Sequence, residues 1–221
     1  MGQVLRLKFK TDQVLSYALS SKSSQTASQE GKRVGEEKGG FEARLNQTII
    51  RSLEDGTGHV VSVTIPKPGA GIPDGARSVI YQHLGPRGEV HEVSGPNQGN
   101  AFSFPEGEVS QGASWEGQTQ SQLPNVPQPV TMKYVYTYDG DEEMLGKPCV
   151  RITFTSEPVE FQVPLPNGQG HSNVKTASDG TMWFDNQAGY LVKLELTTRT
   201  KPQVGPMSFD IENQTIQELV S

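Results

Sequence analysis

The stretch VTMKYVYTYDG, residues 130–140, alternates apolar and polar side chains almost to its end. Successive side chains of a β-strand point to opposite faces of a sheet, so this pattern predicts a strand with one buried and one wet face. Five apolar or aromatic side chains share one parity. They are Val130, Met132, Tyr134, Tyr136 and Tyr138.

The same period of two recurs along most of the chain. Turn signals lie between the stripes, for example DG at 55–56 and GPRG at 85–88. The sequence therefore predicts an all-β fold: a large curved antiparallel sheet, or half-barrel, of about ten to twelve strands with at most one or two short helices. Residues 212–220 fit either a short helix or the end of the last strand. The other stripes are residues 4–9, 15–19, 41–49, 61–65, 77–84, 89–93, 150–154, 159–165, 181–184, 190–196 and 207–211.

The composition agrees with many strands that each have one buried and one solvent-exposed face, and it excludes several classes of protein. Only 33% of the 221 residues are hydrophobic, and no apolar run approaches the ~20 residues that a membrane-spanning helix needs. The net charge of −6 argues against nucleic acid as a partner, because phosphates attract Lys and Arg. The single cysteine excludes an internal disulfide and a cysteine-based zinc site.

Three polar segments interrupt the alternation. Residues 20–40 are rich in Ser, Gln, Lys, Glu and Gly and predict a long hairpin loop, and residues 66–76 predict a Pro/Gly loop. Residues 117–129, a Pro/Gln-rich connection, are the best candidate for a boundary. We expect a single domain, 1–221, with two pseudo-similar halves, 1–116 and 130–221, as the open alternative.

Nothing in the sequence predicts a catalytic residue or a cofactor. Cys149 shares the polar parity of its strand with Arg151, and we interpret it as a small residue filling a sheet position. No Gly-x-Ser-x-Gly elbow and no phosphate-cradling glycine loop before a helix is present. We therefore expect a protein that is not an enzyme.

The metal-ligand candidates are weak, and we predict no metal site. His83 and His91 would face each other if the 85–88 hairpin had a three-residue loop with Gly88 in the left-handed conformation. Asp139 and Asp141 begin a run that resembles a calcium loop but lacks its later Gly and Glu. Exposed histidines and ordinary turn residues are the alternative interpretations.

The tyrosine row suggests a binding surface. Tyrosines suit the mouth of an amphipathic cavity, because each has an apolar body and a polar tip, and they also suit the edge of an ordinary core. As tentative ligand-binding residues on a concave apolar face we take the 130–138 stripe with two residues of the next strand. They are Val130, Met132, Tyr134, Tyr136, Tyr138, Ile152 and Phe154.

Two stretches carry a family resemblance. Residues 104–115 (FPEGEVSQGASW) and residues 180–192 (GTMWFDNQAGYLV) resemble bacterial exported proteins related to the lipoprotein carrier LolA. The resemblance implies a curved half-barrel, an extracytoplasmic location and acyl chains on the concave face. The carriers hold those chains under a helical lid, and this sequence shows no clear lid helix.

The favoured hypothesis is a non-enzymatic β protein that binds a hydrophobic ligand, a lipid or an acyl chain on its concave face. The alternatives are a structural or protein-binding module that uses a sheet face or edge, and a hydrolase with carboxylates in the concavity. The start of the sequence lacks a secretory signal. We expect a periplasmic or cell-surface protein whose signal has been removed, with a cytoplasmic protein as the alternative.

Overall fold

The computed structural model describes residues 2–68, 75–95, 102–121, 126, 129–165 and 170–220. Twelve strands make up one antiparallel sheet, as the sequence predicts. The described residues form no helix, and so include none with the length and hydropathy needed to cross a membrane. The strands are β1 Val14–Gln29, β2 Lys32–Ser52, β3 Gly58–Pro66, β4 Ser78–Leu84, β5 Val90–Ser94, β6 Ser114–Ser121, β7 Val130–Met144, β8 Lys147–Ser156, β9 Val159–Pro164, β10 His171–Asp185, β11 Tyr190–Val204 and β12 Met207–Leu219.

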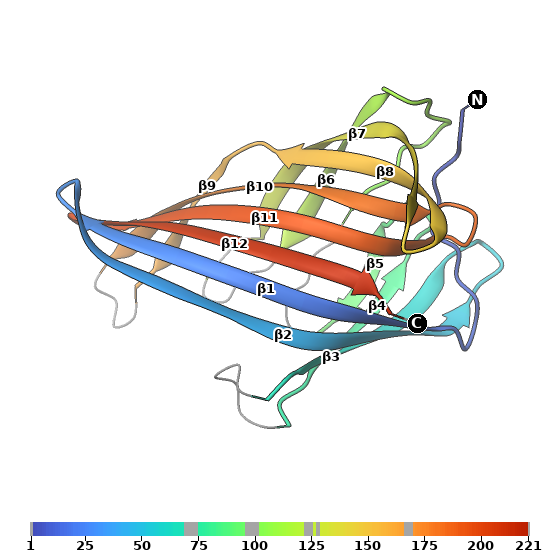
Figure 1. The fold of residues 1–221 in the computed structure, drawn as a ribbon, viewed down its shortest axis with the longest axis horizontal. Helices are drawn as coiled ribbons and strands as arrows, with labels where there is room; N and C mark the ends of the chain where they lie inside the picture. Colours follow the sequence, from blue (N-terminus) through green and yellow to red (C-terminus); the bar gives the residue numbers. More distant parts are fainter. Residues whose placement is uncertain are drawn as a thin grey trace.

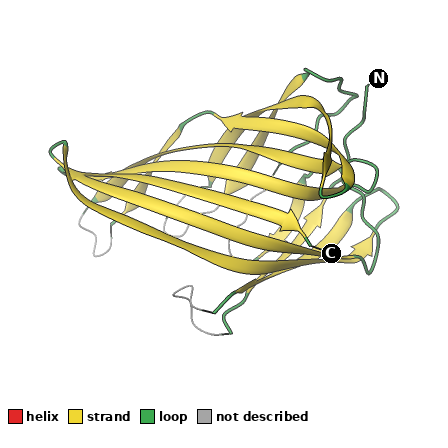
Figure 2. Ribbon diagram, viewed as in Figure 1, coloured by secondary structure: helices red, strands yellow, loops and turns green. Residues whose placement is uncertain are grey.

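The strands form one continuous sheet. Its order is β5-β4-β3-β2-β1-β12-β11-β10-β8-β7-β6, with β9 also paired to β10. β1 lies beside β12, so the first and last strands join the two halves of the chain in the middle of the sheet (Figure 1). The sheet curls so that β4–β7 lie behind the long central strands, without closing into a barrel (Figure 2). The predicted half-barrel is confirmed.

The pairing register gives the sheet two faces. We call the face that carries Tyr17, Tyr136 and Ile152 the inner face, because these side chains are almost fully buried. Two apolar clusters lie on it. The first, on β6–β8, β10 and β11, is the main core, and the second lies on β1–β3.

The expected loop at residues 20–40 is wrong. These residues are the outer parts of β1 and β2, which pair along their whole length. The turn is reduced to Glu30 and Gly31, which have positive φ values of 50° and 78°, as in the two-residue turns that match strand twist. Serine and glutamine are acceptable here because β12 supplies backbone hydrogen bonds on the other side of β1.

The expected strand at residues 4–9 is also wrong. The segment 2–13, which we call the strap, is extended but is not one of the strands, and its isolated bridge joins Gln3 to Val109, which also lies outside the strands. Its alternation serves the core instead, since Leu5 is 0% exposed while Val4 is 44% exposed. A second irregular segment, residues 102–113, contributes Phe104 to the same core.

Several boundaries also differ from the sequence predictions. Residues 117–121, expected in a connection, belong to β6 and pair with β7, while the described residues do not include most of 122–129. Residues 139–144 continue β7, and the turn falls at Leu145 and Gly146. Residues 212–219 end β12 as a strand. In β3 the inward side chain is Val60, not Val61.

Candidate ligand-binding site

An apolar cavity of about 160 Å³ lies on the inner face beside the strap. It is next to the second cluster, where Leu15, Tyr17 and Ile49 form the floor. The lining comes from the strap, β1–β4, the β4–β5 turn, residue 102, the β10–β11 turn, β11 and β12. The lining residues are Leu7, Lys8, Phe9, Leu15, Tyr17, Gln47, Ile49, Val60, Gln82, Leu84, Gly88, Phe102, Gly189, Tyr190, Leu191 and Gln217.

Tyr17 fixes the floor of the cavity. Its ring is 1% exposed, and its hydroxyl donates a hydrogen bond to the Leu191 carbonyl at 3.0 Å. This contact ties β1 to β11 across the intervening β12. Burial, followed by the neighbouring Tyr190, raises the pKa of Tyr17 well above its usual value, so the phenol stays neutral. The floor is therefore uncharged and fixed in position.

The strap closes one side of the cavity. Its backbone is held by Leu7 N–H donating to the Pro86 carbonyl at 2.7 Å and Lys8 N–H donating to Gly189 at 3.0 Å. Phe9 lies directly over Gly58, where a Cβ atom would overlap the phenyl ring. The strap therefore contacts the β4–β5 turn, the β10–β11 turn and the start of β3.

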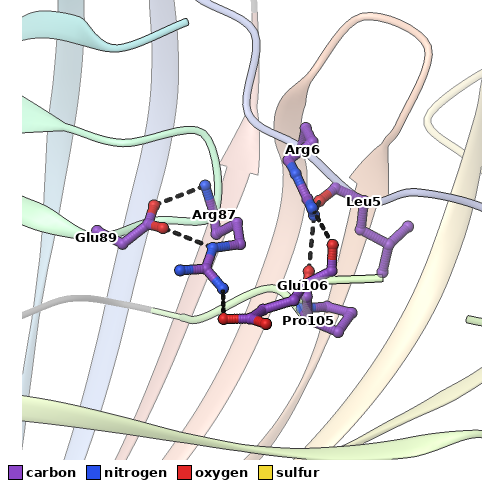
Figure 3. A network of polar contacts seen from close by, with 6 residues as sticks. All are labelled: Leu5, Arg6, Arg87, Glu89, Pro105 and Glu106. Carbon is purple, nitrogen blue, oxygen red and sulfur yellow. Dashed lines mark hydrogen bonds and ion pairs between the residues drawn. The ribbon is translucent and has the colours of Figure 1, made fainter. Parts of the chain in front are cut away.

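A polar network around Arg6 and Arg87 fastens the strap (Figure 3). Arg6 donates to the Pro105 carbonyl at 2.7 Å and also to the Glu106 carbonyl. Arg87 joins Glu89 at 2.6 Å and Glu106 at 3.0 Å. Burial of Glu89 opposes its ionisation, but hydrogen bonds from the backbone and Arg87 outweigh it and lower its pKa. The strap, the 102–113 segment and the β4–β5 turn are thus held together.

The ligand-binding residues expected from the sequence lie together on the inner face, within or beside the main core. Tyr136, Tyr138, Ile152 and Phe154 are buried in the first cluster. Val130 is also buried, while Met132 and Tyr134 are half-buried, and Tyr134 packs against that cluster. Leu5 and Phe104 belong to the same cluster. None of the seven lines the apolar cavity.

The cavity residues were missed because their signals were spread over distant parts of the sequence. The alternation at 15–19 and 41–49 identified Leu15, Tyr17 and Ile49 as buried, but not as neighbours of a void. Gly58 and Gly189 both allow close approach of the strap. The signal that could have found the cavity was a glycine that lies opposite the apolar side chains of a segment outside the sheet.

Charged side chains lie mainly on the outer face of the sheet. The ion pairs Lys175–Glu160, Lys193–Glu218 and Lys201–Asp210 link neighbouring strands on the outer face. Within the described strands, most inner positions carry Ser, Thr, Asn, Gln, Gly, Pro, apolar or aromatic residues. The charged exceptions are Lys32 and Glu37 near the tip of β2, and Asp141 and Glu143 near the end of β7. Lys8 on the strap borders the cavity, and its ammonium donates to the Gln187 carbonyl at 2.9 Å.

His83 and His91 lie close together on the outer face. Gly88 has the expected left-handed φ of 89°, but a bulge pairs His83 with Glu92 rather than with His91. The ring centroids of the two histidines are nevertheless 5.0 Å apart, and His59 stacks on His83 at 4.4 Å. His59 is a neighbour that the sequence did not indicate. No cluster able to hold a metal ion occurs within the described residues.

Asp139 and Asp141 have partners within the protein. Thr153 donates to Asp139 at 3.3 Å, and the Asp141 carboxylate accepts from Tyr138 at 2.5 Å and Gln3 at 3.0 Å. Burial and the Asp141 carboxylate together raise the pKa of Tyr138 to about 12. Asp141 also borders a wide, open hollow of about 490 Å³ that is lined largely by polar and acidic residues, in contrast to the apolar cavity.

Cys149 is buried on the outer side of β8, in a cluster with Trp183 and Val192. Burial, followed by the nearby Asp185 carboxylate, raises the pKa of its thiol to about 11. A nucleophilic cysteine needs a lowered pKa and access to solvent. The position therefore fits a small packing residue, as its parity suggested.

No protein-family model matches this chain, and no curated protein matches its sequence.

Proposed function

We propose that the protein binds a hydrophobic small molecule, a lipid or an acyl chain on the inner face of its curved sheet, without catalysing a reaction. The observation that carries the proposal is the apolar cavity between the strap and β1–β4. Its walls combine aliphatic and aromatic side chains with a few amides at the rim, which is the usual composition of a small-molecule site.

The volume sets the size of the occupant. A dry cavity of about 150 Å³ lined by aliphatic and aromatic side chains can hold a benzene-sized molecule. At about 160 Å³ the present cavity takes a ring or a short chain segment with the strap in place. A longer acyl chain would need Leu7 and Phe9 to move outward. The strap would then serve as the cover that the helical lid provides in the LolA-like carriers.

We also propose that the protein works outside the cytoplasm, at the periplasm or cell surface. The support is the resemblance of residues 104–115 and 180–192 to the LolA-like exported proteins, together with the half-barrel form of the sheet. Immunodetection of the full-length gene product in cell fractions tests this. A product confined to the cytoplasm would overturn the location and leave the binding proposal standing.

Titration with an uncharged apolar dye, N-phenyl-1-naphthylamine, tests ligand binding. We expect saturable fluorescence enhancement that Gln82→Trp weakens at least fivefold, because Gln82 lines the cavity and the indole would fill it. Val79→Trp is the matched control, since Val79 is on the same strand but faces outward and is half-exposed. No saturable enhancement, or equal loss in both variants, would overturn the proposal.

A second candidate function is protein binding through the outer face. Val63 pairs with Val79, and Val61 lies beside them, so an apolar patch forms on the outer side of β3 and β4. A stable oligomer in sedimentation experiments that Val79→Lys dissociates would favour this function. The hydrolase alternative needs paired inner carboxylates. In the described strands Glu37 lies alone near the tip of β2, while Asp141 and Glu143 lie near the end of β7, where Tyr138 and Gln3 donate to the Asp141 carboxylate.

A further inference from the structure

Beyond the cavity, the inner face changes from apolar to hydroxyl-rich. The cross-strand pair Leu19–Gln217 is followed by Ser21–Thr215 and then Ser23–Asn213. At about 3.3 Å per residue, Asn213 lies about 13 Å along β12 from Gln217 at the cavity rim. The next two strands continue the polar surface. We call this set the hydroxyl patch: Ser21, Ser23, Asn213, Thr215, Thr198 and Ser178.

Part of the patch is preorganised and part is free to bind. The hydroxyls of Ser178 and Thr198 hydrogen-bond each other at 3.0 Å, which fixes their side chains. Within the described residues, no side-chain hydrogen bond engages Thr215 or Asn213. Both are half-buried rather than fully exposed. Half-buried donors and acceptors without partners favour a ligand that supplies hydroxyl groups.

An aromatic ring borders the patch. Phe41 on β2 is paired with Ser21, points to the inner face and is 39% exposed. An exposed phenyl face beside neutral hydrogen-bonding groups offers a ligand both an apolar plane and polar contacts. The patch therefore has the chemistry to receive a ring that carries hydroxyls.

Charge argues against an ionic ligand head. The strand-borne Lys, Arg, Asp and Glu residues near the patch, such as Arg199, Asp179 and Glu212, pair with one another on the outer face. The nearest inner carboxylate on these strands is Glu37, paired with Gln25 beyond Ser23. A charged group placed on the patch would lose hydration without gaining a counter-charge, which is costly.

Resting on the proposed function, we infer that the ligand is an amphiphile whose chain enters the apolar cavity and whose uncharged, hydroxylated head lies on the hydroxyl patch. The chemical class is that of a glycolipid with a neutral sugar head. From the strap toward the tip of β1, the inner face is apolar, then hydroxyl-rich at the patch, and apolar again at Ile211 and Phe209 of β12. The position of the hydroxyl patch next to the cavity sets the orientation of the ligand. The experiment below separates recognition of the head from recognition of the chain.

The test is displacement of N-phenyl-1-naphthylamine from the full-length protein by four dodecyl amphiphiles, each kept below its micelle concentration or, for dodecanol, below its solubility limit. They are dodecyl glucoside, dodecanol, dodecanoate and dodecyltrimethylammonium. We expect the glucoside to bind at least tenfold more tightly than either ion, and more tightly than dodecanol. Equal affinities for all four would overturn the inference on the head and leave the proposed function intact. Dye that does not bind at all would overturn both.

Variants locate the head. Thr215→Val and Asn213→Leu should each weaken glucoside binding at least fivefold and leave dodecanol binding unchanged. Thr197→Val is the matched control, because Thr197 lies beside Thr198 but on the outer face. Ser23→Ala is the milder variant if Asn213→Leu lowers the melting temperature. Glucoside affinity that stays at the wild-type value in Thr215→Val and Ser23→Ala would overturn the inference.

Discussion

Leu5 and Val4 are neighbours in the chain with opposite surroundings. Leu5 is 0% exposed among Phe104, Tyr138 and Phe184, whereas Val4 is 44% exposed. We expect Leu5→Ala to lower the free energy of unfolding by about 2–5 kcal/mol, as for a large-to-small core substitution. Val4→Ala should change it by less than about 0.5 kcal/mol.

Urea unfolding of both variants measures the difference. The prediction depends on the strap being a fixed part of the core. The strap is not a strand and has few backbone partners, so the packing of Leu5 must help to hold it there. Similar small effects of both substitutions would mean that the strap separates from the sheet in solution, and the account of the core would then be wrong.

Cys149 predicts a pH dependence of stability. The folded thiol has a pKa raised to about 11 from 9.0, so between those values the native state keeps a proton that the unfolded state releases. The unfolded state then binds fewer protons, and stability falls as pH rises through this window. We expect Cys149→Ala to reduce the slope of unfolding free energy between pH 9 and pH 11. Identical slopes in the variant and the wild type would contradict the burial of the thiol.

At the scale of elements, two glycines in strands should differ sharply. A Cβ atom on Gly58 would overlap the ring of Phe9, whereas nothing lies within 4 Å of the corresponding position at Gly39. We expect Gly58→Ala to cost about 1–3 kcal/mol through overpacking, and Gly39→Ala to be neutral or slightly stabilising.

A double variant isolates the cause. In the Phe9→Ala background, Gly58→Ala should cost much less, because the overlapping ring is gone. Thermal or urea unfolding of the four proteins gives the coupling between the two positions. A cost for Gly58→Ala that is the same in both backgrounds would show that the strap does not pack on β3.

Period-two alternation predicted the class of the fold and most strands, because each strand in this sheet has one buried face. It failed where alternation had another cause. Residues 4–9 alternate because an irregular segment crosses the core, and only the three-dimensional path distinguishes this from a strand. For residues 20–40 the prediction failed in the opposite direction: a strand whose inner face carries mainly Ser and Gln lacks the hydrophobic signal.

The candidate site was predicted in kind and not in position. An inner face with aromatic residues follows from the Tyr134–Tyr138 stripe, and that stripe does lie on the inner face. Whether a void remains there depends on which chain segments fill it. Leu5 and Phe104 occupy the main core, while the cavity remains near Tyr17 and Ile49. Such filling depends on contacts between distant segments, which a local pattern does not encode.

At the scale of the whole molecule, an open curved sheet leaves its inner face to be filled from outside the strands. Here the strap and the 102–113 segment fill the part of the inner face that forms the main core. The ion pairs on the outer face keep charge away from the interior. The division into a packed core, an apolar cavity and a hydroxyl patch is the basis for proposing an amphiphile as ligand.

Methyl NMR of the full-length protein during titration with dodecyl glucoside tests this most directly. We predict saturable shifts at the methyl groups of Leu15, Ile49, Val60, Leu84 and Leu191, which line the cavity. The outer methyl groups of Val79, Val135 and Leu145 should stay unchanged. Shifts confined to the outer residues, or no shifts below the micelle concentration, would contradict binding on the inner face.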